Sequence, residues 1–156
     1  MSKTQKFTNA RLNAIQALYA SELNDTPLEK IVFQFLNGEI GNRIIDEDEQ
    51  GHETFLPLNE TDTELFTKIV REVQKHKTDI DNTILATLSA GWDKERIELL
   101  LQSILRAGIG EFFAQPDLDA PIIINEYTDI TRSFYDGPEV RLVNAILDKF
   151  SKVIRS

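Results

Sequence analysis

The chain has 156 residues, of which 41% are hydrophobic and 28% are charged, and its formal net charge is -9. This length and composition are typical of a single globular domain (1–156), and without an apolar run of about 18 residues the chain is not expected to span a membrane. The absence of cysteine excludes disulfides, thiolate metal ligands and cysteine nucleophiles, and with no secretory signal pattern at its start we expect a cytoplasmic protein.

The charges are distributed unevenly along the chain. Residues 39–64 contain nine acidic residues and one base, which accounts for almost the whole net charge. Both ends are basic: Lys3, Lys6 and Arg11 precede the first acid, and residues 139–156 contain four bases, the first of them Arg141, and two acids. Because lysine and arginine bind phosphate by displacing its counterions, the two ends are candidate nucleic-acid contacts.

The first two predicted helices form a hairpin. Apolar spacing predicts a helix that is capped by Thr8 or Asn9 and ends near Leu23. Thr26 and Pro27 then match a cap and a first helical residue, which predicts a second helix up to about residue 38.

Residues 39–60 lose the helical periodicity. They are rich in acidic residues and are interrupted by two glycines and Pro57, so we expect an acidic surface loop without a strand. Behind this loop Thr61 and Glu64 form a capping-box pattern, which predicts a third helix that runs to about residue 77.

The next two helices are expected to supply the centre of the core. A fourth helix is predicted from about Asp79 to Gly91, followed by Trp92 as an anchor against the core. Asp93 can cap a fifth helix, which is the most apolar of the chain and is therefore expected to be buried on most sides. Gly108 permits a close crossing between this helix and a neighbour.

Two further helices complete an all-α fold class with about seven helices. Asp119 and Pro121 open a sixth helix, in which a 3.6-residue period of apolar side chains continues to Phe134. That period outweighs the β-propensity of the three isoleucines at 122–124. A seventh helix begins after Pro138.

The residue types that most often carry chemistry do not form a recognisable site. His52 and His76 share no motif, and we interpret both as solvated surface histidines. The acidic segment 46–57 resembles a calcium-binding loop, but proline stands at its last position, where a glutamate is needed. Gly108 and Gly110 lie within a predicted helix and do not form a dinucleotide-binding loop. We therefore predict no catalytic residue, no metal site and no cofactor.

Four segments, in this order and spacing, resemble the motifs of the NusB family of bacterial transcription antitermination factors. They are RLNAIQALY at 11–19, ILRAGIGEF at 104–112, INEYTDITRSF at 124–134 and LVNAILDK at 142–149. Together they extend the resemblance over nearly the entire chain, with the acidic segment as an insertion.

The resemblance implies an all-α fold of two packed helical bundles and a non-catalytic role in antitermination on ribosomal RNA operons. In such complexes a NusB protein pairs with the ribosomal protein NusE, and the two bind single-stranded boxA RNA within the elongation complex of RNA polymerase. On this sequence, the implied RNA-binding residues belong to a flexible basic N-terminal arm, to the first helix and to the start of the last helix: Lys3, Lys6, Arg11, Gln16, Arg141, Leu142 and Asn144.

The chain departs from the family pattern within these motifs. Leu142 replaces a phenylalanine and Ala145 a glycine, and a lost aromatic contact to a base would remove about 1–3 kcal/mol of binding. Gly110 replaces a tyrosine, so another side chain must fill that space. Arg106 lies in the most apolar helix and is expected to pair with Glu126 or another carboxylate, because an unpaired buried charge is costly.

Two alternatives stay open. One is a helical protein-protein interaction module that has lost RNA binding. The other is the RNA-targeting module of an rRNA methyltransferase, since NusB-like domains occur fused to such enzymes. The sequence contains neither a glycine-rich cofactor loop nor a catalytic cysteine, which argues against the second alternative.

Overall fold

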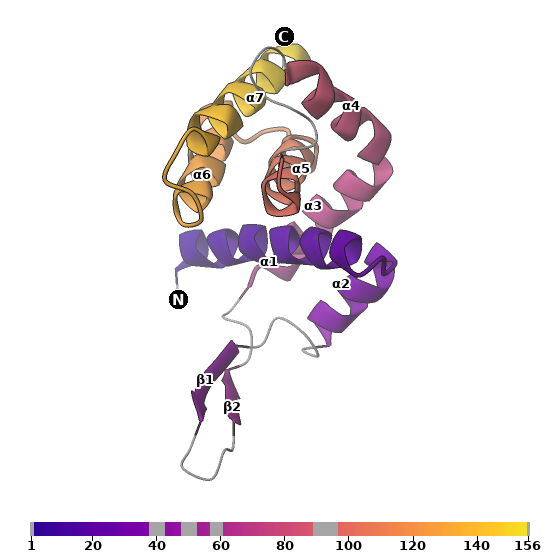
Figure 1. Ribbon diagram of the computed structural model, residues 1–156, viewed down its shortest axis with the longest axis vertical. Coiled ribbons are helices and arrows are strands. Elements are labelled where there is room, and N and C mark those ends of the chain that lie inside the picture. The colour runs from indigo at the N-terminus through magenta and orange to yellow at the C-terminus, as the bar shows by residue number, and fades with distance from the viewer. Residues whose placement is uncertain (1, 38–42, 48–52, 57–60, 89–96, 156) are drawn as a thin grey trace.

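The computed structural model describes residues 2–37, 43–47, 53–56, 61–88 and 97–155, which form seven α-helices and two β-strands (Figure 1). The helices are α1 (Lys3–Leu23), α2 (Leu28–Leu36), α3 (Thr63–Lys75), α4 (Lys77–Thr87), α5 (Leu99–Ala114), α6 (Ala120–Arg132) and α7 (Glu139–Ile154). The strands are β1 (Arg43–Glu47) and β2 (Glu53–Leu56). The predicted helical fold class is confirmed for the body of the protein.

The helix α5 lies at the centre of the fold. Figure 1 shows it almost end-on, with α1, α3, α4, α6 and α7 around it. Eleven of its sixteen residues are buried, in agreement with its apolar sequence. Since a helix that is apolar on most sides must be covered on most sides, the predicted central burial is confirmed.

Two glycines let neighbouring helices approach α5 closely. A Cβ atom at Gly108 would lie 3.0 Å from Cδ2 of Leu147 in α7, and one at Gly110 would lie 2.5 Å from Cγ2 of Val73 in α3. The close crossing predicted at Gly108 is therefore present. At Gly110, where the family pattern has tyrosine, Val73 fills the space.

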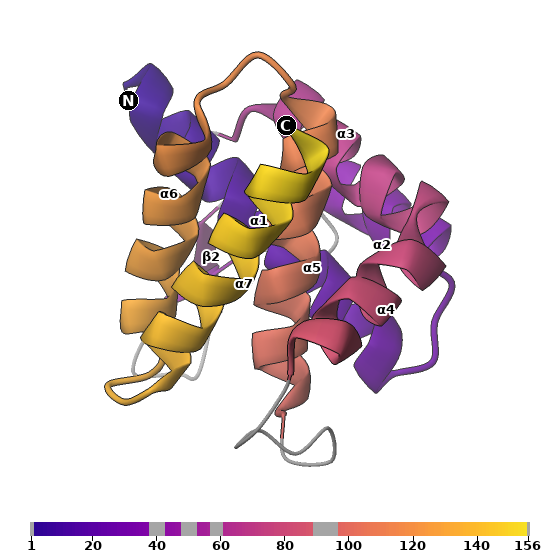
Figure 2. The ribbon, with the colours of Figure 1, turned by 90° about the horizontal axis from the view of Figure 1, so that it is seen from above.

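The other helices form two groups, as the predicted two bundles require. The first group is α1, α2 and α3, which contact one another, and the second is the antiparallel pair α6 and α7, while α4 contacts α3, α5 and α7. Figure 2 shows α6 and α7 side by side along α5, with the N-terminus beside the start of α6. Within the described ranges, no helix has the length and apolar character that crossing a membrane would require.

The acidic segment contains a β-hairpin, so the prediction of a loop without a strand is wrong. β1 and β2 pair antiparallel, with Arg43 opposite Leu56 and Glu47 opposite Glu53. Figure 1 shows the hairpin projecting from the helical body, beyond α1. The isoleucine, threonine and phenylalanine residues of the two strands favour extended backbone, and the neighbouring acids do not cancel that preference.

The start of α1 differs from the prediction because a serine caps it earlier. The Oγ of Ser2 accepts a 3.1 Å hydrogen bond from the backbone N–H of Gln5, so the helix begins at Lys3, before the predicted caps Thr8 and Asn9. Such a bond satisfies one of the N–H groups that a helix start leaves without a partner.

Two other predicted caps are also displaced by one residue. The Oδ1 of Asp62 accepts a 2.8 Å hydrogen bond from the N–H of Leu65, so Asp62 and not Thr61 caps α3. The hydroxyl of Thr61 instead accepts a 2.6 Å hydrogen bond from the side chain of Asn13 in α1. α2 likewise follows Pro27 as its N-cap residue.

Sequence periodicity placed the later helices more accurately. Asp119 is the N-cap of α6 and the helical assignment over 122–124 is confirmed, but α6 ends at Arg132. Phe134 therefore lies beyond the helix and is 51% exposed, where the periodic pattern predicted a buried position. The predicted anchor Trp92 and cap Asp93 lie outside the described residues, as does His52.

Two polar side chains have partners that the sequence did not identify. Nε of Arg106 donates to Oδ1 of Asp81 in α4 at 2.8 Å, so the carboxylate that pairs with it is not Glu126. The ring of His76 stacks on that of Phe113, with centroids 4.1 Å apart. The interpretation of His76 as a solvated histidine is therefore wrong, because α5 covers one face of its ring.

Candidate nucleic-acid interface

The first two turns of α1 present two of the predicted cations. Because Ser2 caps the helix, Lys3 and Lys6 are helical and do not belong to an unstructured arm. Lys3 is exposed, and its ammonium group lies 5.6 Å from the ring centre of Phe7. Lys6 is half-buried, and its carbonyl accepts a 3.3 Å hydrogen bond from the N–H of Asp62. The helix thus places both lysines at one end of α1.

Arg11 follows in the same helix but is buried, with 2% of its surface exposed. Its Nε and Nη2 donate to the two carboxylate oxygens of Glu111 at 2.8 Å each, and its Nη1 lies 3.3 Å from Oε2 of Glu126. Burial alone would lower the pKa of Arg11, but the hydrogen bond and charge of Glu111 outweigh burial and raise it. This placement disagrees with the predicted RNA contact of Arg11, since its guanidinium already faces two carboxylates.

The carboxylate of Glu111 is the centre of a buried polar network. It also accepts hydrogen bonds from the Tyr127 hydroxyl at 2.8 Å and from Nε2 of Gln115 at 3.0 Å. Burial raises the pKa of Tyr127 well above its ordinary value, and the charge of Glu111 raises it further, so the hydroxyl remains a donor. The network joins α1, α5 and α6. Sequence reasoning missed it, because Arg11 and Glu111 are 100 residues apart.

The start of α7 divides the predicted residues between its two faces. Arg141 and Asn144 are exposed, as is Gln16 in α1, so all three remain candidate contacts. Leu142 is only 7% exposed and belongs to the hydrophobic core. The predicted contact between Leu142 and RNA therefore disagrees with the structure. The leucine that stands here in place of the family's phenylalanine affects the packing of the core.

The lysines of α1 and the exposed residues of α7 lie at opposite ends of α6. Figure 2 shows the N-terminus beside the start of α6, whereas α7 begins beyond the end of α6. The thirteen residues of α6 correspond to a length of about 20 Å. The turn between α6 and α7 adds the exposed ring of Phe134, which the sequence pattern had assigned to the core. An exposed aromatic ring in the turn that precedes α7 suits the stacking of an unpaired base.

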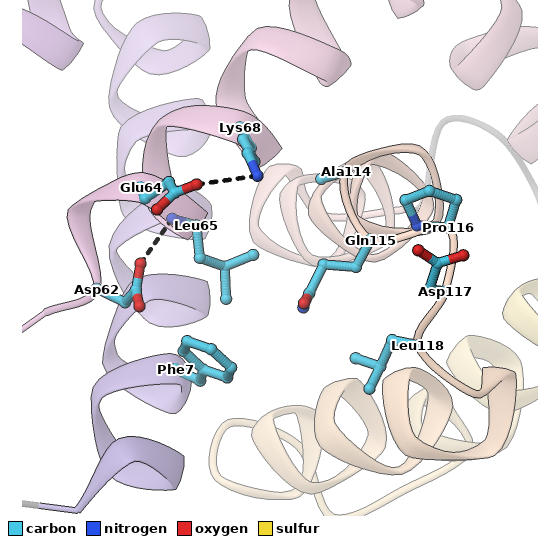
Figure 3. A pocket seen from close by; sticks show the side chains of 10 residues that line it. All are labelled: Phe7, Asp62, Glu64, Leu65, Lys68, Ala114, Gln115, Pro116, Asp117 and Leu118. Atoms are coloured by element: carbon cyan, nitrogen blue, oxygen red, sulfur yellow. Dashed lines mark hydrogen bonds and ion pairs between the residues drawn. The ribbon is translucent and has the colours of Figure 1, made fainter.

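A hollow of about 350 Å³ adjoins the N-terminal turns of α1 (Figure 3). Phe7 of α1, Leu65 of α3 and Leu118 from the segment between α5 and α6 point toward it. Lys68 at its rim is paired with Glu64 at 3.1 Å, which leaves the rim net acidic together with Asp62 and Asp117. The hollow itself is therefore unsuited to phosphate. In the described ranges no group of His, Asp or Glu side chains could hold a metal ion.

The model of the NusB family matches residues 8–152. The chain belongs to the NusB family. Transcription antitermination protein NusB of Sphingopyxis alaskensis is 34% identical over 153 residues, which cover 98% of this chain and 97% of the relative. The protein of the same name from Rhodospirillum rubrum is 36% identical over 153 residues, which cover 94% of this chain and 83% of the relative. The family is therefore one of transcription antitermination factors.

Solved structures confirm the NusB fold. NusB of T. maritima superposes with a TM-score of 0.68 at 24% identity, over 93% of this chain and 89% of that chain. A chain in the crystal structure of a plectonemic RNA supercoil superposes with a TM-score of 0.69 at 18% identity, over 96% of both chains. At these identities the superpositions establish the common fold.

Proposed function

We propose that the chain is a non-catalytic transcription antitermination factor that binds single-stranded, boxA-type RNA together with the ribosomal protein NusE. The observation that carries the proposal is the family match across residues 8–152, with relatives that are named for antitermination. RNA and NusE follow from the family resemblance, and the bound RNA would belong to an elongation complex of RNA polymerase.

The polar residues of α1 and α7 that reach solvent, of which Lys6 is half-buried and the others are exposed, support this proposal. Lys3 and Lys6 would neutralise phosphates at one end of α6, while Arg141 and Asn144 would contact the strand at the other end. A helical arrangement holds these side chains in place before RNA arrives, which reduces the entropy cost of binding. Gln16 adds an exposed donor and acceptor on α1.

The modest number of cations supports a role for a protein partner. Because each neutralised phosphate contributes to affinity through counterion release, an interface with two lysines and one arginine binds RNA weakly by itself. The formal net charge of -9 works against RNA binding at long range. NusE would supply further contacts to the same strand and so raise the affinity of the complex.

The proposal is tested by titrating labelled boxA RNA with the protein alone, with NusE alone and with both, at several salt concentrations. We expect weak, salt-dependent binding by the protein alone and much tighter binding by the mixture. A scrambled RNA of the same length and composition serves as the control. Absence of salt-dependent binding in both protein arms would overturn the proposal.

The buried positions of Arg11 and Leu142 favour one other function, a protein-protein interaction module that does not bind RNA. Under this alternative the protein would bind NusE, and boxA RNA would neither bind nor change the affinity of the pair. A pull-down with NusE, carried out with and without RNA, separates the two functions.

A further inference from the structure

We propose that Glu126, although it is acidic, promotes RNA binding by anchoring the N-terminal half of α1. This inference rests on the proposed function, because the lysines that it positions are the proposed phosphate contacts. It makes Glu126 a positioning residue that acts through Arg11 and Thr8 and not through contact with RNA.

Within the part of the chain that the structure describes, two side-chain contacts of Glu126 reach the same part of α1. Its Oε2 lies 3.3 Å from Nη1 of Arg11 and 3.4 Å from the hydroxyl of Thr8, whose single proton it shares with the Thr4 carbonyl at 3.1 Å. Thr8 and Arg11 are three residues apart, so both face α6 from neighbouring turns of one helix. Lys3 and Lys6 occupy the turns immediately before them. A carboxylate of α6 thus fixes the stretch of α1 that carries the cations.

The surroundings of α1 make this anchor important. On the side of Phe7 the helix borders the hollow of about 350 Å³ shown in Figure 3, so its first turns are incompletely packed there. The segment between Lys6 and Arg11 has another backbone tie, the 3.3 Å hydrogen bond from the N–H of Asp62 to the Lys6 carbonyl. Arg11 lies one turn further along this side of the helix, and its ion pair with Glu126, in which the two side chains are 3% and 26% exposed, therefore adds to the Glu111 pair in holding the helix end.

The substitution Glu126→Gln should change RNA affinity in opposite directions, depending on whether Glu126 acts through its charge alone or by positioning the lysines of α1. Removal of a negative charge strengthens RNA binding if only the long-range field matters. If Glu126 positions the lysines, the same substitution weakens RNA binding. Asp129→Asn is the matched control, because Asp129 is also in α6, is 70% exposed and pairs only locally with Arg132 at 2.6 Å.

The experiment is a salt-dependent titration of boxA RNA in the presence of NusE with five proteins: wild type, Glu126→Gln, Asp129→Asn, Lys3→Ala/Lys6→Ala and the triple variant Lys3→Ala/Lys6→Ala/Glu126→Gln. We expect Glu126→Gln to weaken binding about three-fold or more and to reduce the salt slope toward that of the double-lysine variant. Asp129→Asn is expected to bind as tightly as wild type or slightly more tightly. In the background without the lysines, Glu126→Gln should have no further effect, since the two changes act on one contact.

Equal or tighter binding by Glu126→Gln relative to Asp129→Asn would overturn the inference and leave the proposed function intact. Failure of wild type to bind RNA would overturn both. Hydrogen exchange of the free proteins tests the anchor independently: amides 6–11 should exchange faster in Glu126→Gln than in Asp129→Asn. Unchanged exchange would also overturn the inference. Thr8→Val, which removes only a hydroxyl donor, provides a milder second variant with the same expected direction.

Discussion

The hydroxyl of Tyr127 and the guanidinium of Arg11 donate to the same carboxylate oxygen of Glu111, each at 2.8 Å. Three helices, α1 from the start of the chain and α5 and α6 from its last third and the segment just before it, therefore meet at one buried anion. An unpaired buried carboxylate is costly, so each donor matters to stability.

The substitution Tyr127→Phe is expected to destabilise the protein by about 1–3 kcal/mol, because it removes a buried hydrogen bond to a charged acceptor while it leaves the ring in place. Urea unfolding measures the loss. Tyr135→Phe is the control, since the Tyr135 hydroxyl donates to Glu98 in an exposed pair at 2.8 Å, and it should cost less than about 1 kcal/mol. Equal losses for the two variants would contradict the role of the buried network.

The two glycines of α5 are expected to differ in their tolerance of alanine. At Gly110 the new Cβ would lie 2.5 Å from Val73 Cγ2 and 3.2 Å from the carbonyl oxygen of Ile69, so Gly110→Ala should destabilise the protein by about 1–3 kcal/mol. At Gly108 the nearest atoms, at 3.0 Å, are the terminal methyls of Leu147, which can move.

For Gly108→Ala, the gain of up to about 1 kcal/mol in helix propensity should offset much of the contact cost. Thermal or urea unfolding of the two variants makes the comparison. A double-mutant cycle with Val73→Ala adds a check. Part of the stability that Gly110→Ala loses should return in the double variant, because the Val73 methyl that contacts the new Cβ is absent. If the two alanine variants lose the same free energy of unfolding, the close approach of α3 to α5 at Gly110 is not rigid.

Substitution of both Lys3 and Lys6 by alanine is expected to reduce the salt slope of RNA binding by about 1.4, or about 0.7 for each phosphate contact with a single strand. Lys30→Ala/Lys75→Ala is the matched control, because it removes the same charge from exposed positions in α2 and α3. Its slope should equal that of wild type. If the salt slope falls by the same amount in both double variants, Lys3 and Lys6 act through the net charge of the protein and not through contact with RNA.

The ion pair between Glu22 and Lys77 is expected to make stability depend on pH in the acidic range. The hydrogen bond from Lys77 is the main cause that lowers the pKa of Glu22 below its ordinary value of 4.5. A lowered pKa in the folded state stabilises the protein above the pKa of the unfolded state, and this contribution disappears as pH falls through the folded value.

The difference in unfolding free energy between wild type and Glu22→Gln should therefore be largest above about pH 5 and shrink below pH 4.5. Its size should stay below about 1 kcal/mol, since the pair is partly exposed to solvent. Unfolding curves from pH 3 to pH 7 measure it. In a Lys77→Ala background most of the difference should be absent. If it persists there, the effect comes instead from Arg106, whose Nη1 lies 3.8 Å from Oε1 of Glu22.

Local sequence signals predicted the number and order of the helices well. Asp119 and Pro121 mark the start of α6, and a 3.6-residue apolar period defines α6 and α7, because a helix needs only near neighbours to form its backbone hydrogen bonds. The predicted cap of α3 was one residue from Asp62, whereas that of α1 was six or seven residues from Ser2, since several polar residues near a helix start can serve as the cap.

The hairpin in the acidic segment shows where local reasoning was insufficient. The stretch 43–56 has both high charge, which favours a solvated loop, and β-branched or aromatic residues, which favour strands. Only pairing between β1 and β2 decides between them, and pairing depends on two segments together.

The sequence by itself determined the family, the helical class and the burial of α5, because each depends on patterns within one segment or on motifs in a fixed order. The tertiary structure alone decided which cations reach solvent. Lys3 and Arg11 look equivalent along the sequence, yet Lys3 is exposed while Arg11 is buried against Glu111. Their difference arises from a carboxylate 100 residues away, whose position is set by how α1 packs on α5.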